Sequence, residues 1–389
     1  MRGTARVGLC VALGLLVSSV CVADMSATAV NDLMSRGYQA IKANDVATAK
    51  SAFQTVLKDA AASSRAAEAM LRIGYLQLRE SSPEALATFK AVTEQHPNAV
   101  EAVNAFCKLG SLHMRKKCYD DSQSAFLAAA GHEAAPTSIK ARSQLNAAFV
   151  EIMKAHANEY WARDVDGKFQ LVRTDSAAAK IEHLEMARKQ FQVIRTEYAR
   201  GSSPQFAAIA DAAIGEIYLL GKTPALAERA YWRAIREYGT MPAALNTLAR
   251  YGVAQARYHQ GDPEGALEQL NQALDEFAPG YVEGFEVAPK SLKGSISVWK
   301  VAVLFELGQL DEALAAAKQT QAEVGVLPTP AARQAHAQLL LWDGYLTSEI
   351  GSVDEAVETL QSVIARHPST PQATRAGLIL RGLEMEGTN

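Results

Sequence analysis

Cysteine is scarce in this sequence, with four residues among 389. Cys10 and Cys21 fall in an N-terminal segment that we expect to be removed or, at Cys21, lipidated. Cys107 and Cys118 lie on or just past one predicted helix, where the residues between them rise about 16 Å, too far for a disulfide. We therefore predict no disulfide framework, and we expect Cys107, which sits in an apolar helical pattern, to be buried.

The sequence also lacks an excess of positive charge and any familiar catalytic motif. Lys and Arg total 39 against 42 Asp and Glu, for a net charge of −3, which argues against a nucleic-acid partner. There is no Gly-x-Ser-x-Gly elbow, phosphate-binding glycine loop or His-Glu-x-x-His zinc helix. We expect no enzyme, no metal and no cofactor. Asp343, beside Gly344, is the one acid predicted to be partly buried, either in an ion pair or at a functional site.

Long hydrophobic runs are absent beyond the N-terminus. Arg2 and Arg6 precede the apolar run Val7–Val20, and small residues follow before Asp24, so residues 1–23 read as a secretory signal peptide. A retained anchor and lipidation of Cys21 are the alternatives; the branched residue before Cys21 disfavours lipidation. We expect a mature chain that is soluble and periplasmic, with membrane association through a partner left open.

What the sequence does contain is a spacing that returns about every 34 residues. A small residue is followed twelve positions later by Ala or Ser, four later by a large apolar residue, and three later by another apolar one. The clearest sets are Gly37, Ala49, Phe53 and Val56; Gly110, Ser122, Phe126 and Ala129; Gly215, Ala227, Tyr231 and Ala234; and Gly344, Ala356, Leu360 and Val363. Such a period predicts stacked helix pairs, in which the small residues of the two helices face each other and the aromatic fills the gap to the next pair.

This pattern, with prolines recurring after the second helix, resembles tetratricopeptide repeats (TPR). The resemblance implies an all-α, right-handed α-solenoid of about eight TPR helix pairs. Repeats one to six span 30–277, an irregular joint or long loop covers 278–294, and repeats seven and eight with a capping helix span 295–385. As the family resemblance implies, the first helix of each repeat lines a concave surface.

The fourth repeat carries an insertion at about residues 160–176. Asp166-Gly167 stands between two strand-like runs and predicts a β-hairpin. An isolated hairpin is marginally stable, so this one either packs on the helices or reaches a partner through Trp161 and Phe169.

The concave face is the predicted binding surface. Positions six and three before the small residue, and one and five after it, share one face of the first helix. The peptide-binding candidates at or near these positions are Tyr38, Lys42, Tyr75, Arg79, Asn104 and Arg115. An aromatic stripe with a basic edge suits a peptide whose acidic group or carboxyl terminus meets the cations. We therefore expect a non-catalytic adaptor of the bacterial cell envelope that binds another protein or peptide; the alternatives are a ligand-binding subunit of a transport or sensing system, or an enzyme subunit.

Overall fold

The computed structural model describes residues 25–157, 159–163, 169–173, 176–200, 203–238, 242–277, 289–324 and 330–386. The predicted signal peptide, the Asp166-Gly167 turn and most of the predicted joint lie outside these ranges. The first eight helices are α1 (Ala27–Lys42), α2 (Val46–Asp59), α3 (Ala66–Arg79), α4 (Glu84–Gln95), α5 (Val100–Arg115), α6 (Tyr119–Gly131), α7 (Thr137–His156) and α8 (Ala177–Tyr198). The others are α9 (Pro204–Leu220), α10 (Pro224–Arg236), α11 (Ala243–Tyr258), α12 (Pro263–Asp275), α13 (Pro289–Glu306), α14 (Leu310–Val324), α15 (Pro330–Ile350), α16 (Val353–Arg366) and α17 (Pro371–Glu386).

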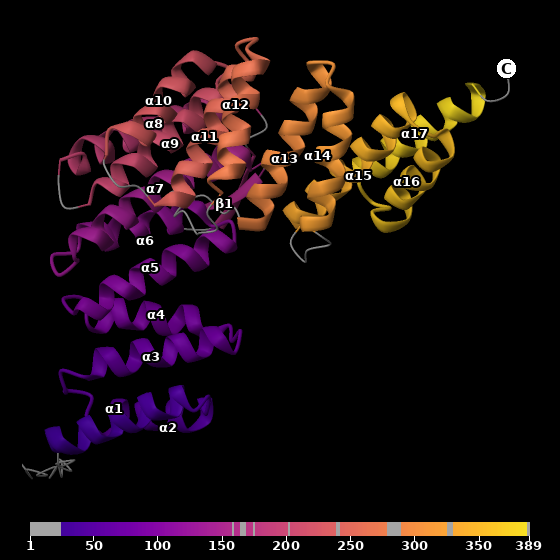
Figure 1. The fold of residues 1–389 in the computed structure, drawn as a ribbon. Helices are drawn as coiled ribbons and strands as arrows, with labels where there is room; N and C mark the ends of the chain where they lie inside the picture. Colours follow the sequence, from indigo (N-terminus) through magenta and orange to yellow (C-terminus); the bar gives the residue numbers. More distant parts are fainter. Residues whose placement is uncertain are drawn as a thin grey trace, which may run out of the picture. The chain divides into compact units, whose positions relative to one another are not determined.

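These helices form consecutive pairs, which confirms the predicted helical-repeat fold (Figure 1). The chain divides into an N-terminal part, residues 1–102, and a C-terminal part, residues 103–389. The N-terminal part holds α1 to α4, in the pairs α1/α2 and α3/α4. The C-terminal part holds most of α5 and all later elements, and ends with α17 packed on α15 and α16.

In six helix pairs the turn between the two helices has one backbone conformation. A residue with positive φ follows the first helix at Asn44, Ser81, Lys117, Lys222, Gly261 and Gly308. This left-handed residue ends a helix by offering its N–H to the last turn. In the first pair the Asp45 carboxylate then accepts from the Thr48 N–H at 3.0 Å and begins α2. The recurring turn explains why the helix pairs repeat so regularly.

The recurring spacing of small and aromatic residues also brings the two into direct contact within one helix pair. A Cβ placed on Gly37 would lie 2.6 Å from the Phe53 ring, so the aromatic packs directly on the glycine of its own pair. Gly74 and Phe89, Gly110 and Phe126, and Gly215 and Tyr231 repeat this contact. The Tyr231 ring also lies against Gly252 of the next pair, as the gap-filling prediction requires. The glycines are therefore needed chiefly to admit a ring.

The small residue of the second helix does lie close to the first helix, and a serine at this position in the third pair shows the contact. Ser122 replaces the usual alanine, is fully buried, and donates its hydroxyl to the Gly110 carbonyl at 2.8 Å. A contact this short between a side chain and a helix backbone requires closely crossing helices.

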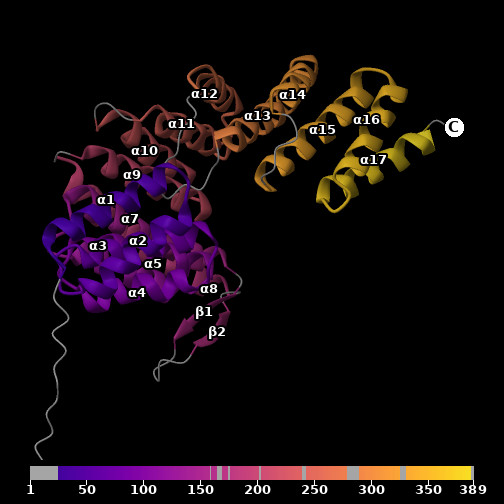
Figure 2. The same cartoon turned by 90° about the horizontal axis from the view of Figure 1, so that it is seen from below.

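The inserted segment contains two short strands. β1 (Glu159–Arg163) and β2 (Phe169–Arg173) pair antiparallel, with Glu159 opposite Arg173 and Arg163 opposite Phe169. They lie side by side in Figure 2, and β1 contacts α6. The side chains of Trp161 and Phe169 lie outside the described part of the structure, so their predicted contact with a partner stays a prediction.

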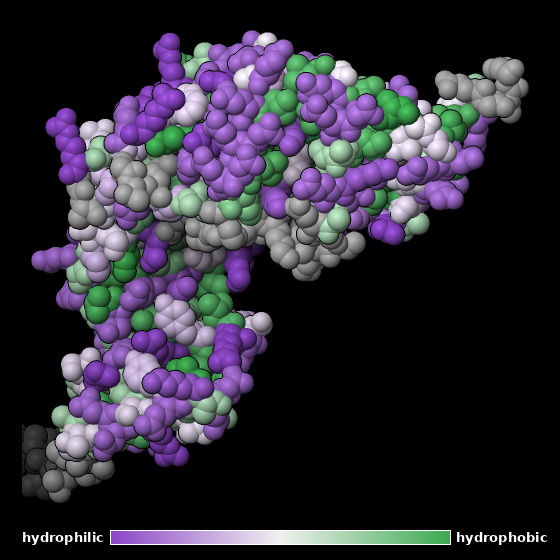
Figure 3. Space-filling model, in the orientation of Figure 1, coloured by the Kyte–Doolittle hydropathy of each residue, from purple (hydrophilic) through white to green (hydrophobic). Residues whose placement is uncertain are grey.

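Within the described residues, no helix combines the length and apolar character needed to cross a bilayer. Cys107 and Cys118 are not joined in a disulfide. Cys107 is half-buried rather than buried, and its sulfur lies 3.4 Å from the Ser143 hydroxyl. Figure 3 shows hydrophobic residues in small patches separated by hydrophilic ones.

Candidate functional site

Tyr38, the first predicted groove residue, is engaged by its neighbours in the N-terminal part. Its hydroxyl donates to the Glu68 carboxylate and accepts from the Arg72 guanidinium at 3.1 Å. The Arg72 guanidinium lies over the Tyr38 ring, 5.0 Å from its centre, as a cation–π contact. Burial raises the pKa of Tyr38, and the bond to Glu68 adds to this effect. Tyr38 therefore joins α1 to α3.

The other candidates of the N-terminal part are less enclosed. The Tyr75 ring packs edge-on against Phe89, with centres 5.5 Å apart. Arg79 is exposed and donates to the Asn44 side chain, next to the first turn. Lys42 is exposed. Lys42 and Arg79 thus remain accessible to an acidic partner.

Asn104 and Arg115 lie on α5, in the C-terminal part. Asn104 is half-buried and Arg115 is exposed. The two are eleven positions apart, a rise of about 16 Å along the helix, so they do not form one compact site.

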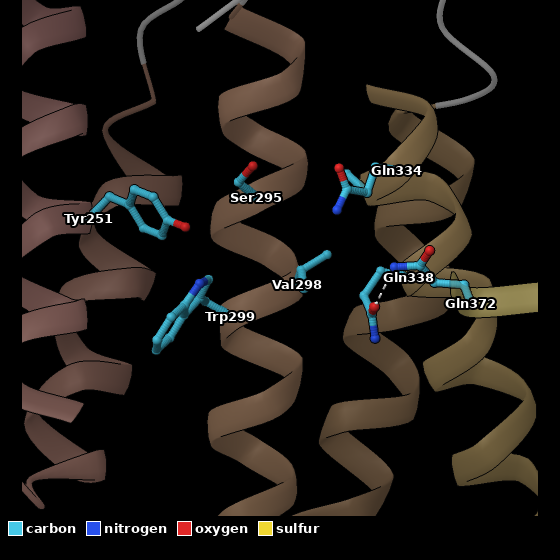
Figure 4. A pocket seen from close by; sticks show the side chains of 8 residues that line it. Tyr251, Ser295, Val298, Trp299, Gln334, Gln338 and Gln372 are labelled. Carbon is cyan, nitrogen blue, oxygen red and sulfur yellow. Dashed lines mark hydrogen bonds between the residues drawn. The ribbon is translucent and has the colours of Figure 1, made fainter. Parts of the chain in front are cut away.

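A cavity of about 310 Å³ opens on the C-terminal part, at first helices that the sequence analysis did not single out. Side chains from α11, α13, α15 and α17 converge on it (Figure 4). The lining residues are Tyr251, Ser295, Val298, Trp299, Gln334, Ala335, Gln338 and Gln372. None of these eight residues is charged, so the cavity is suited to a neutral group.

Amide groups form one wall of this cavity. The Gln372 side-chain NH2 donates to the Gln338 carbonyl oxygen at 3.0 Å, joining α17 to α15. Gln372 is only 7% exposed, and its own carbonyl oxygen has no hydrogen-bond partner among the described residues. Gln334 is exposed at the same wall. An unsatisfied buried acceptor is uncommon and calls for a physical explanation.

Aromatic groups form the opposite wall. The Trp299 ring meets Tyr258 edge-on, with centres 5.2 Å apart, and meets His259 at 5.9 Å. Burial raises the pKa of Tyr251, and the nearby Glu216 carboxylate adds to the rise. The Tyr251 hydroxyl therefore stays neutral at physiological pH. This wall offers ring faces and a hydroxyl.

The offsets used to find the N-terminal candidates also predict half of this site. Applied to the sixth, seventh and eighth repeats, whose crossing residues are Ala254, Val301 and Gly344, they give the lining residues Tyr251, Ser295, Val298 and Gln338. The binding surface predicted from the sequence covered only the first three repeats. Trp299 and Gln372 were missed because their approach depends on how neighbouring helices cross.

Asp343 is held by structural contacts. Its oxygens accept from the Gln321 amide at 3.0 Å and the Thr347 hydroxyl at 3.3 Å. Lys318 Nζ lies 3.9 Å away, and burial raises the pKa of the carboxyl group. Of the two predicted roles, these contacts favour the ion pair.

Two further buried carboxylates escaped the sequence analysis. Asp211 on α9 accepts two hydrogen bonds from Arg233, at 2.7 and 3.2 Å, and one from the Tyr238 hydroxyl. Glu151 on α7 accepts from Gln123 and His183, each at 2.7 Å. Both carboxylates are fully buried and saturated by partners from neighbouring helices. They therefore tie helices together and present no free group for chemistry.

Comparisons with known proteins agree with this geometry. A family model described as tetratricopeptide repeat matches residues 35–100 and 220–281. No curated protein matches the chain in sequence.

Solved structures with similar folds share little sequence with this chain. A signal-transduction ATPase with a tetratricopeptide-repeat sensor from Pyrococcus horikoshii gives a TM-score of 0.56 at 11% identity, over 93% of this chain and 50% of that one. A tetratricopeptide repeat protein from Parabacteroides merdae gives 0.50 at 11% identity, over 80% of this chain and 99% of that one. The apo form of RapI gives a TM-score of 0.50 at 13% identity, over 92% of this chain and 98% of that one. These likenesses show the fold.

Proposed function

The chain is a tetratricopeptide-repeat protein, and from that premise we propose that it is a non-catalytic scaffold that binds a protein or peptide partner on its first helices. The observation that carries the proposal is the cavity of about 310 Å³ between α11, α13, α15 and α17. Its aromatic and amide walls offer ring contacts and hydrogen bonds, which together fit a polypeptide segment.

We place this scaffold in the bacterial cell envelope. The support is the sequence of residues 1–23, with two arginines before a short apolar run and small residues at a cleavage position. Fractionation of producing cells, with mass determination of the chain, tests the placement. A periplasmic product that begins at Asp24 supports it, and a cytoplasmic product that keeps residues 1–23 contradicts it.

Partner binding is tested with a photo-crosslinking residue placed at Gln334 and, in a matched control, at Gln361. Both glutamines are exposed in helix interiors, but only Gln334 lines the cavity. We expect one protein to be captured from position 334 and none from position 361. The captured protein is then purified, and its affinity is measured for the wild type, Gln334→Arg and Gln361→Arg. A loss confined to Gln334→Arg supports the cavity, and equal binding by all three chains contradicts it.

A small-molecule-binding subunit is the second candidate. The cavity volume lies at the lower end of the range for ligand sites, about 300–1,000 Å³. Native mass spectrometry of the chain purified from cells decides this point. A bound small molecule that Gln334→Arg loses and Gln361→Arg keeps would favour the second candidate over the first.

A further inference from the structure

Two glutamines of the cavity, the half-buried Gln338 and the buried Gln372, occupy equivalent places on α15 and α17. Gln338 on α15 and Gln372 on α17 are 34 residues apart, which is one repeat period. Their side chains meet through the single hydrogen bond from Gln372 Nε2 to Gln338 Oε1, drawn as a dashed line in Figure 4. The pair is therefore built by the repeat itself and faces the cavity from one wall.

One hydrogen bond leaves most of the capacity of the two amides unused. Each glutamine amide has two N–H donors and a carbonyl oxygen with two lone pairs. With this bond made, the Gln372 oxygen has no partner within the described part of the chain, and the bond does not use the Gln338 NH2 group. Exchanging oxygen and nitrogen in both amides would keep the bond but exchange the roles, leaving the carbonyl oxygen on Gln338 and the NH2 group on Gln372. The pair offers one acceptor and one donor in either case, and the roles given below follow the assignment in the structure.

The unpartnered oxygen carries an uncompensated cost. Water does not reach the Gln372 oxygen, so its desolvation is not balanced by a hydrogen bond. The last side-chain torsion of glutamine is broad. Rotation about this torsion can turn the oxygen toward the cavity that the same side chain lines. A ligand that supplies an N–H donor relieves the cost.

The group that matches a carbonyl oxygen and an NH2 group on one wall is the main chain of one residue in an extended segment. The N–H and C=O of that residue point to the same side, so the N–H can donate to the oxygen while the C=O accepts from the NH2 group. The eight lining residues are uncharged, so the cavity provides no partner for an acidic or basic side chain. Trp299 and Tyr251 on the opposite wall suit an apolar or aromatic side chain of the same segment.

We infer that Gln338 and Gln372 bind the main chain of an extended, uncharged peptide segment, with the Gln372 oxygen accepting a backbone N–H and the Gln338 NH2 donating to a backbone carbonyl. The inference rests on the proposed function and names the chemistry of its partner. Recognition of the main chain makes affinity depend on an accessible extended segment, while the aromatic wall selects the side chain.

The experiment uses peptides as the probe and changes one backbone atom at a time. Short random peptides displayed on phage are selected on the whole mature chain and counter-selected on Gln334→Arg. The best peptide is then synthesised with each backbone N–H replaced in turn by an ester oxygen, which removes one donor and keeps the side chains. Affinities are measured by calorimetry for the wild type, Gln372→Met and the exposed control Gln361→Met, after thermal unfolding has shown intact folds.

We expect one ester position to weaken binding to the wild type and to Gln361→Met about tenfold, the size of one lost buried hydrogen bond. The same ester is expected to change nothing for Gln372→Met, because its acceptor is gone. If Gln372→Met does not fold, Gln338→Met replaces it. The peptide carbonyl that Gln338 binds is then changed to a thioamide, and this change is expected to have no effect on binding to Gln338→Met.

The outcomes separate the two levels of the proposal. Peptides that bind the wild type but show no sensitive backbone position, or the same sensitivity in the glutamine variant, overturn the amide inference and leave the scaffold standing. Failure to select any peptide that prefers the wild type over Gln334→Arg overturns peptide binding in this cavity, and the inference with it.

Discussion

Gly215 and the ring of Tyr231 are packed so closely that a Cβ atom on the glycine would lie 2.8 Å from the ring carbons. The ring cannot easily move away, because Tyr231 is fully buried and its other face lies against Gly252. Its hydroxyl is also held by the Glu216 carboxylate at 3.1 Å. Through Gly215 and Gly252, the Tyr231 ring joins the fifth helix pair to the first helix of the sixth. The packing around this ring therefore contributes to the stability of the fold.

Gly215→Ala should destabilise the chain although alanine favours helix. The substitution gains about 1 kcal/mol of helix propensity, and the added methyl group in a packed core costs about 1–3 kcal/mol. We expect the cost to exceed the gain because both sides of the ring are blocked. Gly377→Ala is the matched control, since its nearest neighbouring atom would be 3.9 Å away, and it should stabilise by up to about 1 kcal/mol. Urea unfolding measures both, and a stabilising Gly215→Ala would show that the core adapts.

Asp211→Ala should be strongly destabilising. It removes a buried carboxylate that Arg233 and Tyr238 share, and loss of one member of a buried ion pair costs about 3–5 kcal/mol. Arg233 is about one third exposed, so water can partly hydrate it, and we expect the lower end of that range. Glu185→Ala is the control, because it breaks a similarly close pair with Arg188 in which the carboxylate is 48% exposed and not buried, and it should cost about 0–1 kcal/mol. Equal effects would contradict a special role for Asp211.

The chain should lose stability in mild acid through His336 and His367. Their ring nitrogens lie 3.0 Å apart, and both side chains are buried. Burial lowers the pKa of both from the ordinary 6.5, and the positive charge of Arg366 adds to the effect on each. Protons therefore bind these rings in the folded chain only at a lower pH than in the unfolded chain, which binds them below about pH 6.5, so the free energy of unfolding falls as pH drops through that value.

Thermal unfolding at about pH 7.5 and about pH 5 measures this loss. The double substitution of His336 and His367 by glutamine should reduce the difference between the two temperatures. Other titrating groups contribute to both chains alike, so the comparison isolates the pair. An unchanged pH dependence in the double variant would assign the acid sensitivity to other groups.

Tyr38→Phe should loosen the N-terminal part without weakening partner binding at the cavity. The variant removes the hydroxyl that Glu68 and Arg72 share, at a cost of about 1 kcal/mol. Hydrogen exchange of the α1 amides should become faster by a corresponding factor. If Tyr38→Phe binds the partner more weakly than the wild type does, the partner binds the predicted aromatic stripe and not the cavity.

The sequence alone was enough to predict the helix pairs. The 34-residue period, the small residues and the recurring prolines are local features, and each is read from neighbouring positions. The left-handed residues at Asn44 and Gly261 follow first helices that this period predicts. The contact between Gly37 and Phe53 was not predicted, since a ring and a glycine sixteen positions apart meet only after two helices have crossed.

The binding surface depended more on tertiary structure. The period places Gln338 and Gln372 on equivalent faces of successive first helices, so their proximity is implicit in the sequence. Whether their amides touch, and whether a cavity remains beside them, depends on the volumes of side chains from four helices and on how those helices cross. The sequence by itself determined the repeat and the face of each helix. Only the tertiary structure decided that Tyr38 is occupied by its neighbours while a buried carbonyl of Gln372 has no partner, because hydrogen-bond satisfaction is a property of the packed molecule.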